Sequence, residues 1–567
     1  MNKSKSNTRT RLLSPANIGI LLVGGAYGLF RAIDLAWVCD DAFITFRYAK
    51  NFIDGHGLIF NIGERVEGYT SFLWTMLVSM GQLLNAELIR FSQVLSIAAY
   101  LGTALLLALL SIRFLRDGSR KSRVLIPIAA LAILFMHDYQ VWATSGMETS
   151  LAALIITLGT YTLVCAKDRW QFAVAGFAMV LAILTRPEAM LCLVMGGIYI
   201  LIVERPVLRA LLYYVIPAFV VYMPYWIVRY NYYGYPFPNT YYAKSGNLAY
   251  WSQGWIYLWL FVKTYYVLFV IVPAAIWLIL RMRKQLRAKT GKFDFISRVG
   301  LLSLLICVPY IAYIIRVGGD FMFARLFIPV IPLCFLVIEA ALASIRMSAA
   351  VRAVIGVLII VFTWGSVNQF ADASLDIGGI VDERAFYPEG AVNQAQTQGK
   401  LLKRVFTGVD SVTVAFYGMR AMLIYYSEFP VAIEAHTGLT DEYLAHMPIT
   451  SRGRPGHEKQ APYEYLKKRR VLFCFPSPGP LPEVSRIWFG GLEAAMLHWD
   501  NRVMEHLKGY PEVRFIDFPA YFDRYIQESY SRPDNQVRND LAYFKRFYFD
   551  FNDDPQRLEQ LRLRLGG

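Results

Sequence analysis

The sequence has little charge for its length. Of its 567 residues, 17% are Asp, Glu, Lys or Arg and 56% are hydrophobic, and the mean hydropathy is +0.38. A soluble protein of this length would carry more charge. Repeated apolar runs of about 20 residues are instead typical of transmembrane helices. The composition therefore predicts a polytopic α-helical membrane protein.

The sequence also lacks the motifs of several common kinds of site. Its six cysteines stand singly, without CxxC or Cys/His spacing, so neither a zinc site nor a disulfide framework is indicated. No GxGxxG or P-loop sequence occurs in the more polar C-terminal part, which disfavours nucleotide binding there. No internal repeat and no low-complexity segment is visible.

Positive charge exceeds negative charge, but its distribution does not suggest a nucleic-acid partner. Lys and Arg number 57 against 42 Asp and Glu, a net charge of +15. The basic residues gather in short loops between apolar runs, which is typical of cytoplasmic loops and not of a nucleic-acid groove. The N-terminus, MNKSKSNTRTR, precedes an apolar run without a small-residue cleavage pattern. We expect an uncleaved anchor with its basic end in the cytoplasm.

Placing the N-terminus and the basic loops inside predicts eleven membrane spans. The apolar stretch Phe72–Leu84 breaks the parity if it crosses. It is too short to span comfortably, so we expect it to lie on or re-enter the outer face. The spans are expected near residues 14–38, 91–112, 124–138, 149–166, 171–184, 188–203, 210–228, 255–280, 299–315, 324–343 and 353–370. Nearly all unusual polar motifs of the membrane half then fall on the outer side, although the charge count did not use them.

The hydropathy drops after about residue 370. This change predicts two domains, a membrane domain over residues 1–370 with a first outer loop at 39–90, and an extracytoplasmic α/β domain over 371–567. In the second domain, strands at 412–416, 430–435 and 470–475 should alternate with helices at 392–405, 419–427, 461–468 and 492–507. This alternation suggests a small α/β layer with parallel strands.

Two adjacent carboxylates, Asp40 and Asp41, stand where the first span ends and the first outer loop begins. Ionisable groups at a membrane boundary are costly, so a functional role is the default interpretation. A carboxylate there could take the proton from an attacking hydroxyl, or it could ligate a divalent cation that neutralises a phosphate. The structural alternative is a helix cap or an ion pair with Arg47 or Lys50. Between the two acids we favour Asp41 as the base.

Other outer-face motifs combine cations with aromatic or glycine residues. In RYNYYGYPFPNTYYAKSG, tyrosine faces could stack on sugar rings while Arg229 and Lys244 pair with a phosphate. An interfacial aromatic belt would give the same composition. In RVGGDFMFAR, the diglycine and Asp320 lie between Arg316 and Arg325, which could hold a phosphate. That pattern also fits a turn with interfacial anchors.

Three further motifs have weaker patterns. Arg186 and Glu188 flank Pro187 in TRPE and could serve the site or simply pair at a helix boundary. The run Thr144–Ser150, TSGMETS, predicts a helix N-cap with a supporting role. The tail loop GRPGHEK contains His457 and could lean over the membrane site or be a solvated loop.

The ordered set of these motifs resembles a known family. DDAFITFRYAKN, GHGLIFNIGERVEGYTS, TSGMETS, LTRPEA, RYNYYGYPFPNTYYAK, GGDFMFAR and GRPGHEK are similar to motifs of the terminal arabinofuranosyltransferases (AftB-like) and of related proteins in Gram-negative bacteria. The resemblance spans nearly the whole chain. It implies a GT-C fold with about eleven spans and carries the catalytic role onto Asp40 and Asp41. It also brings Glu67 and Tyr69 of the second motif into the candidate site.

The resemblance implies a membrane glycosyltransferase of the bacterial inner membrane with its site on the extracytoplasmic side. The expected donor is a polyprenyl-phosphate sugar, with D-arabinofuranose as the sugar, and the acceptor is a glycan or glycoprotein. A divalent cation stays open as a cofactor. Transfer of another lipid-linked sugar is the first alternative. A transporter for such lipids would place polar groups at mid-membrane and show inverted halves, neither of which is visible here.

Overall fold

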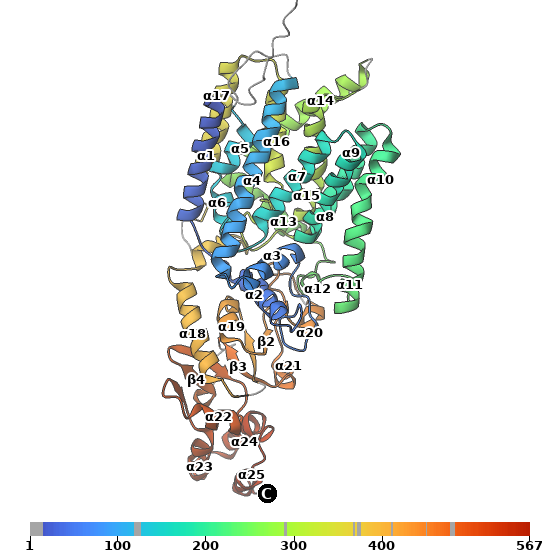
Figure 1. Cartoon of the computed structure of the whole chain (residues 1–567). Helices are drawn as coiled ribbons and strands as arrows, with labels where there is room; N and C mark the ends of the chain where they lie inside the picture. The colour runs from blue at the N-terminus through green and yellow to red at the C-terminus, as the bar shows by residue number, and fades with distance from the viewer. Residues whose placement is uncertain are drawn as a thin grey trace, which may run out of the picture. The chain divides into compact units, whose positions relative to one another are not determined.

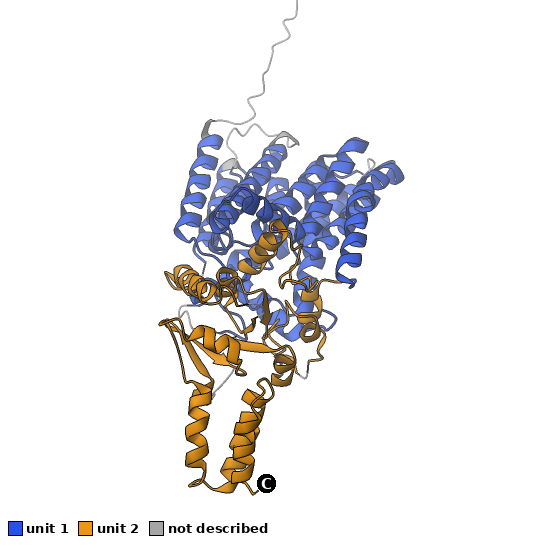
Figure 2. Cartoon of the chain, turned by 60° about the horizontal axis from the view of Figure 1, so that its bottom comes forward, with its two compact units in different colours: residues 1–42, 70–236, 246–387 blue, residues 43–69, 237–245, 388–567 orange. Residues whose placement is uncertain are grey.

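The computed structural model describes residues 15–117, 126–288, 292–366, 369–370, 376–409, 412–449, 451–476 and 482–566. The basic N-terminal stretch and part of the basic loop at 113–123, on which the predicted topology partly depends, lie outside them. The chain forms two compact units, coloured separately in Figure 2. Unit 1 comprises residues 1–42, 70–236 and 246–387, and unit 2 comprises residues 43–69, 237–245 and 388–567. The predicted domain boundary after residue 370 marks where the chain is expected to leave the membrane. It is a different kind of division from these contact-based units, and it stays a prediction.

Unit 1 is built from helices, several of which run side by side in Figure 1. They are α1 (Pro15–Asp34), α3 (Phe72–Leu83), α4 (Leu88–Asp117), α5 (Ile128–Phe135), α6 (His137–Trp142), α7 (Thr149–Cys165), α8 (Arg169–Thr185), α9 (Met190–Val203), α10 (Val207–Pro217), α11 (Met223–Tyr233), α13 (Trp251–Thr264), α14 (Ile271–Arg287), α15 (Phe295–Val317), α16 (Ile331–Ser344) and α17 (Ala349–Trp364). Helix α2 (Asp40–Ile53) begins in unit 1 and continues into unit 2.

Four helices of the described residues are long and apolar enough to cross a membrane, and six shorter apolar helices accompany them. The long ones are Leu88–Phe114, Val207–Tyr233, Tyr266–Arg287 and Phe295–Val317. Most predicted spans coincide with a helix, but the count of eleven stays a prediction.

Three predicted spans are wrong in their bounds, and proline accounts for two of them. The span at 124–138 is instead α5, Ile128–Phe135, which ends before α6 begins at His137. The span at 255–280 is instead α13 and α14, separated by a short 3₁₀ segment, Tyr266–Val270. Pro273 has no N–H to bond the preceding turn, so it fits only near the start of α14. The span at 324–343 begins later, at Ile331, again with a proline, Pro332, in its first turn. The residues between the end of α15 at Val317 and Ile331 therefore form a loop.

Small residues let the helices of unit 1 approach closely. A Cβ added at Gly254 of α13 would lie 1.9 Å from the carbonyl oxygen of Ile315 in α15. A Cβ at Gly176 of α8 would lie 1.8 Å from the carbonyl oxygen of Tyr214 in α10. Both contacts are with backbone, so any side chain at either position would push two helices apart.

Unit 2 contains a six-stranded sheet in the order β2-β1-β3-β5-β4-β6. The strands are β1 (Thr413–Phe416), β2 (Val431–Glu434), β3 (Val471–Phe475), β4 (Arg486–Phe489), β5 (Leu492–Met496) and β6 (Val513–Phe515). The helices are α12 (Asn239–Ala243), α18 (Ala391–Val405), α19 (Ala421–Ser427), α20 (Glu442–His446), α21 (Tyr463–Lys468), α22 (Asn501–Leu507), α23 (Phe518–Ser529), α24 (Asp534–Phe544) and α25 (Pro555–Arg564).

The prediction of an α/β domain is confirmed. The predicted parallel pairing is correct only for the three strands β2, β1 and β3. Strand β1 pairs in parallel with β2 and β3, but β3–β5, β5–β4 and β4–β6 are antiparallel. The predicted helix at 492–507 is wrong in its first part, because Leu492–Met496 forms β5 and only Asn501–Leu507 is helical. Leu492, Ala494 and Ala495 are buried in the sheet, so tertiary burial overrides helix propensity here.

Residues 43–69 are fixed within unit 2 by a buried arginine. Arg47 of α2 donates hydrogen bonds to the carbonyl oxygens of Phe60 (2.7 Å), Ile424 (3.3 Å) and Phe429 (2.5 Å). Burial lowers the pKa of Arg47 to about 10, which still leaves it charged at neutral pH. These bonds tie α2 and its loop to α19 and the strand that follows.

Candidate active site

The first turn of α2 holds both candidate acids. The backbone leading into it is fixed by hydrogen bonds from Cys39 N to Ser145 O (2.9 Å) and from Asp40 N to the Tyr387 hydroxyl (3.0 Å). Acidic side chains in a first turn are stabilised by the unpaired N–H groups and the helix dipole. The sequence thus places two carboxylates where a helix favours their charged forms.

The two acids differ in their access to solvent. Asp40 is 6% exposed, whereas the side chain of Asp41 is 33% exposed. A general base has to come within hydrogen-bond distance of the proton that it removes. Of the pair, Asp41 is therefore the more accessible acid, and its role as the base stays a prediction.

Arg47 and Lys50, the cations offered for an ion pair in the structural alternative, have other contacts. Arg47 bonds backbone carbonyls of unit 2, as described above. Lys50 pairs with Asp54 at 3.0 Å and with Glu428 at 3.6 Å. The cation beside Asp41 is instead Arg325, whose Nη1 lies 3.8 Å from the Asp41 Oδ2.

Arg325 reaches this position through a loop with two unusual backbone turns. Gly318 (φ +92°) and Gly319 (φ +71°) end α15 in the left-handed region. There a Cβ on Gly319 would lie 2.4 Å from the Tyr257 ring, so glycine is required. Ala324 also has a positive φ, +64°, which is costly for a residue with a Cβ and typical of functional loops. The turn at Ala324 sets the direction of the chain at Arg325.

Around Arg325 lie three carboxylates. Besides Asp41, its guanidinium nitrogens lie 3.6 Å from Asp320 Oδ2 and 3.8 Å from Glu148 Oε1. The side chains of Asp320 and Glu148 are 6% and 3% exposed. The Nε of Arg325 is buried and has no hydrogen-bond partner among the residues that the structure describes. A buried guanidinium with a remaining donor has the chemistry to bind an additional anionic oxygen.

The network continues to the TRPE motif. Arg186 Nη1 bonds the same Glu148 Oε1 at 2.7 Å and also pairs with Glu188, which accepts a hydrogen bond from the Tyr310 hydroxyl at 3.3 Å. Asp41, Arg325, Glu148, Arg186 and Glu188 therefore form one chain of charged contacts. We call this chain, together with Asp320, the Asp41–Arg325 network.

Cys39 lies beside this network but is not a nucleophile. Its side chain is fully buried. Burial, reinforced by the negative charges of Asp41 and Glu383, raises the pKa of the Cys39 thiol well above its ordinary value. The thiol therefore stays protonated.

Two predicted cations of unit 1 have other contacts. Arg229, in the last turns of α11, donates through Nη1 to the carbonyl oxygens of Tyr235 (3.2 Å) and Pro236 (3.0 Å), and so holds the turn that follows the helix. Arg316 is in the last turn of α15 and is half-buried. Its position at a helix C-terminus suits a cation.

The remaining candidates belong to unit 2. Glu67 and Tyr69 are buried there. The Glu67 carbonyl oxygen accepts from Asn239 N at 3.0 Å, and the Tyr69 ring lies 4.9 Å from the Tyr48 ring. The Glu67 contact joins this segment to α12, and the Tyr69 contact packs the segment against α2.

Lys244 and His457 lie close together within unit 2. A Cβ added at Gly456 would lie 3.4 Å from the Lys244 Cε, and the His457 ring is 4.9 Å from the His436 ring. Burial, with the charges of His436, Arg454 and Lys244, lowers the pKa of His457 to about 4. His457 is therefore neutral near pH 7, while Lys244 is exposed to solvent.

No group of three or more His, Cys, Asp or Glu side chains that could hold a metal ion occurs among the described residues. The Asp41–Arg325 network consists of acids separated by arginines. Its geometry is that of ion pairing rather than of convergent metal ligation.

Sequence reasoning missed Glu148. The run Thr144–Ser150 was expected to cap a helix, and α7 does begin at Thr149, but its N-cap residue Glu148 makes no side-chain capping bond. Glu148 instead joins the two arginines. An acid directly before a long apolar run was the available signal, because a buried charge needs a partner.

The chain is similar in sequence to two curated glycosyltransferases. No protein-family model matches the chain. Over 431 residues it is 26% identical to the terminal β-(1→2)-arabinofuranosyltransferase of Corynebacterium glutamicum, covering 69% of this chain and 61% of that protein. Over 401 residues it is 28% identical to the protein of the same name from Mycobacterium tuberculosis, covering 62% of each. The chain thus spans about three fifths of the length of these curated relatives.

Among solved structures, the chain is similar to ArnT from Cupriavidus metallidurans bound to undecaprenyl phosphate. The TM-score is 0.50 at 13% identity, covering 75% of this chain and 87% of that one. This likeness shows the fold, which is the predicted GT-C fold of a multi-pass membrane protein.

Proposed function

We propose that this chain is a membrane glycosyltransferase that moves D-arabinofuranose from a polyprenyl phosphate to a cell-envelope glycan or glycoprotein. The observation that carries the proposal is the contact between Asp41 and Arg325 at the start of α2, 3.8 Å apart, with Asp41 partly exposed. The named relatives are arabinofuranosyltransferases, and the ArnT structure holds a polyprenyl phosphate. Both support the choice of donor.

The proposed reaction uses one carboxylate and one cation. A hydroxyl oxygen of the acceptor bonds to the anomeric carbon of the donor sugar, and the bond from that carbon to the phosphate oxygen breaks. The Asp41 carboxylate takes the hydroxyl proton, and polyprenyl phosphate leaves with the electron pair. Arg325 meets the negative charge that develops on the phosphate.

The other candidates have supporting places in this proposal. Asp320 and Glu148 hold Arg325 in position, while Arg186 holds Glu148 and is itself paired with Glu188. Arg316, Arg229 and Lys244 form the pool from which a second phosphate contact is drawn, and His457, Glu67 and Tyr69 stay candidates for substrate binding within unit 2. In this proposal the protein lies in a bacterial inner membrane with Asp41 on the extracytoplasmic side.

The deciding experiment compares donors with one purified preparation of the full chain. Synthetic polyprenyl phosphates carrying D-arabinofuranose, a hexose and an aminosugar are each incubated with a synthetic arabinofuranosyl acceptor. Mass spectrometry and NMR then detect the new linkage and its anomeric form. We expect product from the arabinofuranose donor and a β-(1→2) bond, as the names of the relatives suggest.

If only the hexose or the aminosugar donor gives product, the alternative is correct, and the protein transfers another lipid-linked sugar on the same fold. Movement of donor lipid across a reconstituted vesicle membrane, without any new glycosidic bond, would favour a transporter and contradict the proposal.

A further inference from the structure

A pocket of about 250 Å³ lies within unit 1, outside the Asp41–Arg325 network. The ends of α1, α5, α6, α13 and α17 contribute to its wall, together with Ser366, Gln369, Phe370 and Asp382. Its lining includes Tyr27, Asp138, Gln140, Phe323, Trp364 and Asp382. Its volume is just below the range of about 300–1,000 Å³ in which drug-sized ligands bind, so it suits a ligand of one ring.

One wall of this pocket is aromatic and rigid. The Tyr27 ring stacks on Phe135, with centroids 4.5 Å apart and planes 16° apart. The Trp364 Nε1 donates to the Tyr27 hydroxyl at 2.7 Å, although Trp364 is 59% exposed. Aromatic faces fixed in this way offer an apolar platform for a flat ring.

The polar part of the lining is acidic. Asp138 and Asp382 contribute carboxylates, and Asp138 Oδ2 accepts from the Tyr265 hydroxyl at 2.5 Å. The lining cation, Arg31, is already paired with Asp34. Carboxylates accept hydrogen bonds from hydroxyl groups but repel phosphate and other anions. The pocket therefore favours a neutral ligand with several hydroxyls over a lipid phosphate.

The pocket shares a wall with the proposed active site. Phe323 lines the pocket, and two residues later Arg325 belongs to the network. Trp142 lies beneath both, because its Nε1 donates to the Phe323 carbonyl at 3.0 Å and its ring lies 6.0 Å from the Arg325 guanidinium carbon. Val381, which precedes the lining residue Asp382, exchanges backbone hydrogen bonds with Phe321 and Phe323.

We propose that this pocket binds one sugar ring of the acceptor glycan, next to the ring whose hydroxyl attacks the donor. The proposal rests on the proposed function, since it takes the acceptor to be a neutral saccharide. The tryptophan and tyrosine of the wall stack on the ring, and Asp382 accepts hydrogen bonds from its hydroxyls. The pocket would thus select acceptors that have at least two sugar units.

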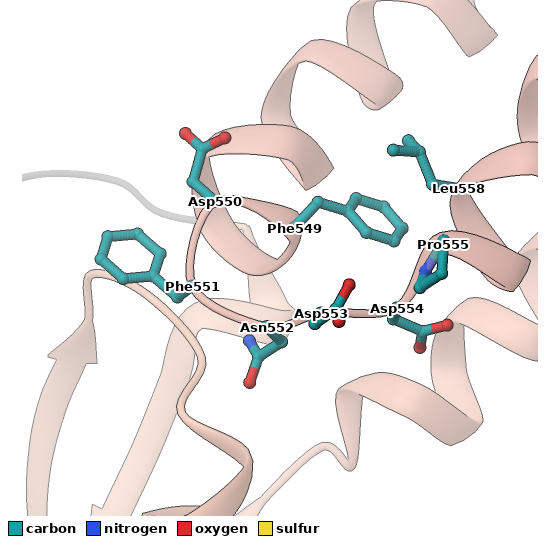
Figure 3. Close-up of a pocket in the computed structure, with 8 residues that line it drawn as sticks. All are labelled: Phe549, Asp550, Phe551, Asn552, Asp553, Asp554, Pro555 and Leu558. Carbon is teal, nitrogen blue, oxygen red and sulfur yellow. The ribbon is translucent and has the colours of Figure 1, made fainter.

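A second pocket lacks the features that favour a sugar ligand. It lies in unit 2 between Phe549 and Leu558, with a volume of about 340 Å³ (Figure 3). Its acids are largely engaged, because Asp550 pairs with Lys467 at 2.6 Å and Asp554 with Arg557 at 2.7 Å. Its lining lacks the tryptophan platform of the first pocket.

The test measures acceptor use by Asp382→Asn and Trp364→Ala in the full chain. Two controls match them. Asp376→Asn changes an acid in the same loop, whose carboxylate accepts from Gly379 N. Trp277→Ala removes an exposed indole whose Nε1 donates one hydrogen bond, to Ser344 Oγ at 2.8 Å. Each protein is assayed with a one-ring and a two-ring synthetic arabinofuranoside as acceptor, and binding of both is followed by saturation-transfer NMR.

We expect the two pocket variants to raise KM for the two-ring acceptor at least 10-fold and to leave KM for the donor unchanged, with little effect on the one-ring acceptor. The controls should behave like the wild type.

The pocket proposal would be overturned if the pocket variants lost activity equally with both acceptors, or lost none with either. The proposed function would still stand in that case, provided that the wild type transfers the sugar. If the wild type transfers no sugar, the proposed function fails, and NMR still decides the pocket. Weaker saccharide signals in the pocket variants would support it, and unchanged signals would overturn it.

Discussion

Asp40 and Asp41 are neighbours in sequence but have different surroundings. The Asp40 backbone N–H bonds the Tyr387 hydroxyl, which in turn donates to Glu383 at 3.1 Å. Asp41 faces Arg325 and retains access to solvent. In our account Asp40 fixes the start of α2, and Asp41 performs the proton transfer.

Arg325 is the side chain on which the phosphate part of the account depends. Arg325→Lys keeps the charge but loses the planar fork, so donor use should weaken, and Arg325→Ala should weaken it further. For the alanine variant we expect kcat/KM for the donor to fall by about 2–4 kcal/mol in transition-state terms. Steady-state kinetics with the synthetic donor provide the measurement.

The control for this series is Arg90→Ala, because Arg90 is on the exposed side of α4, with its side chain 87% exposed. An Arg325→Ala protein with the donor kcat/KM of the wild type would show that this arginine only neutralises its three carboxylates. The phosphate contact would then have to come from Arg229 or Lys244.

The residues of the site were partly predictable from the sequence. The predicted site residues Asp41, Asp320 and Arg325 do lie together, whereas their roles and that of Asp40 stay predictions. The sequence could not show that Glu148 joins Arg325 to Arg186, since the three residues come from separate segments and meet only through helix packing. Nor could it show that Arg229 holds a turn, because its partners are backbone carbonyls.

At the scale of elements, the loop from Gly318 to Val330 depends on the packing of the helices beside it. Gly254 lets α13 lie against the end of α15, directly before the diglycine turn. Tyr257, one turn further along α13, donates its hydroxyl hydrogen to the Met322 carbonyl at 3.0 Å. The position of Arg325 therefore depends on the α13–α15 contact.

Gly254→Ala tests this dependence. The added Cβ would meet backbone at 1.9 Å, so we expect a loss of about 1–3 kcal/mol in stability from overpacking, together with reduced transfer activity. Thermal unfolding of the purified protein and the transfer assay measure the two effects. Gly25→Ala in α1 is the control, since nothing lies within 4 Å of its Cβ position. A Gly254→Ala protein with normal stability and activity would contradict the role given to this contact.

Element boundaries were predictable where caps or hydropathy are strong. The helix at 149–166 and the three strands at 412–416, 430–435 and 470–475 appear within a few residues of their expected places. The break at Tyr265 was missed because hydropathy continues through it, although Pro273 gave a signal. The strand Leu492–Met496 was missed because its sequence, LEAAM, has a high helix propensity that burial in the sheet overrides.

At the scale of the whole molecule, contacts divide the chain differently from hydropathy. Residues 43–69 and 237–245 belong to the same compact unit as the C-terminal sheet. Arg47 and Asn239 explain why, since both bond backbone carbonyls in the 424–441 region. Hydropathy could not predict this grouping, because it reports the surroundings of a segment and not its partners.

The stability of unit 2 should depend on pH through His457. Burial, with the charges of His436, Arg454 and Lys244, lowers its folded pKa to about 4, below the usual value of about 6.5. The unfolded chain therefore binds the proton first as pH falls, so stability is full above about pH 6.5 and is lost between about pH 6.5 and 4. The loss from this group is at most about 3 kcal/mol.

Thermal unfolding of the full chain between pH 7 and 4 measures this effect. His457→Asn should flatten the pH dependence, although His498, with a pKa also lowered to about 4 by burial, leaves part of it. His56→Asn, at an exposed position of the same unit, should retain the slope of the wild type. An unchanged slope in the His457 variant would show that its environment is more open to water than the structure indicates.

The account's central claim is that Asp41 takes the proton in glycosyl transfer. The most direct measurement is the single-turnover rate of the Asp41→Asn protein, preloaded with the synthetic arabinofuranosyl donor, beside Asp54→Asn, a control in the turn directly after the same helix. We predict a rate about 100- to 10,000-fold below that of the wild type, with donor binding retained and the control unaffected. A near-normal rate for Asp41→Asn would contradict the claim.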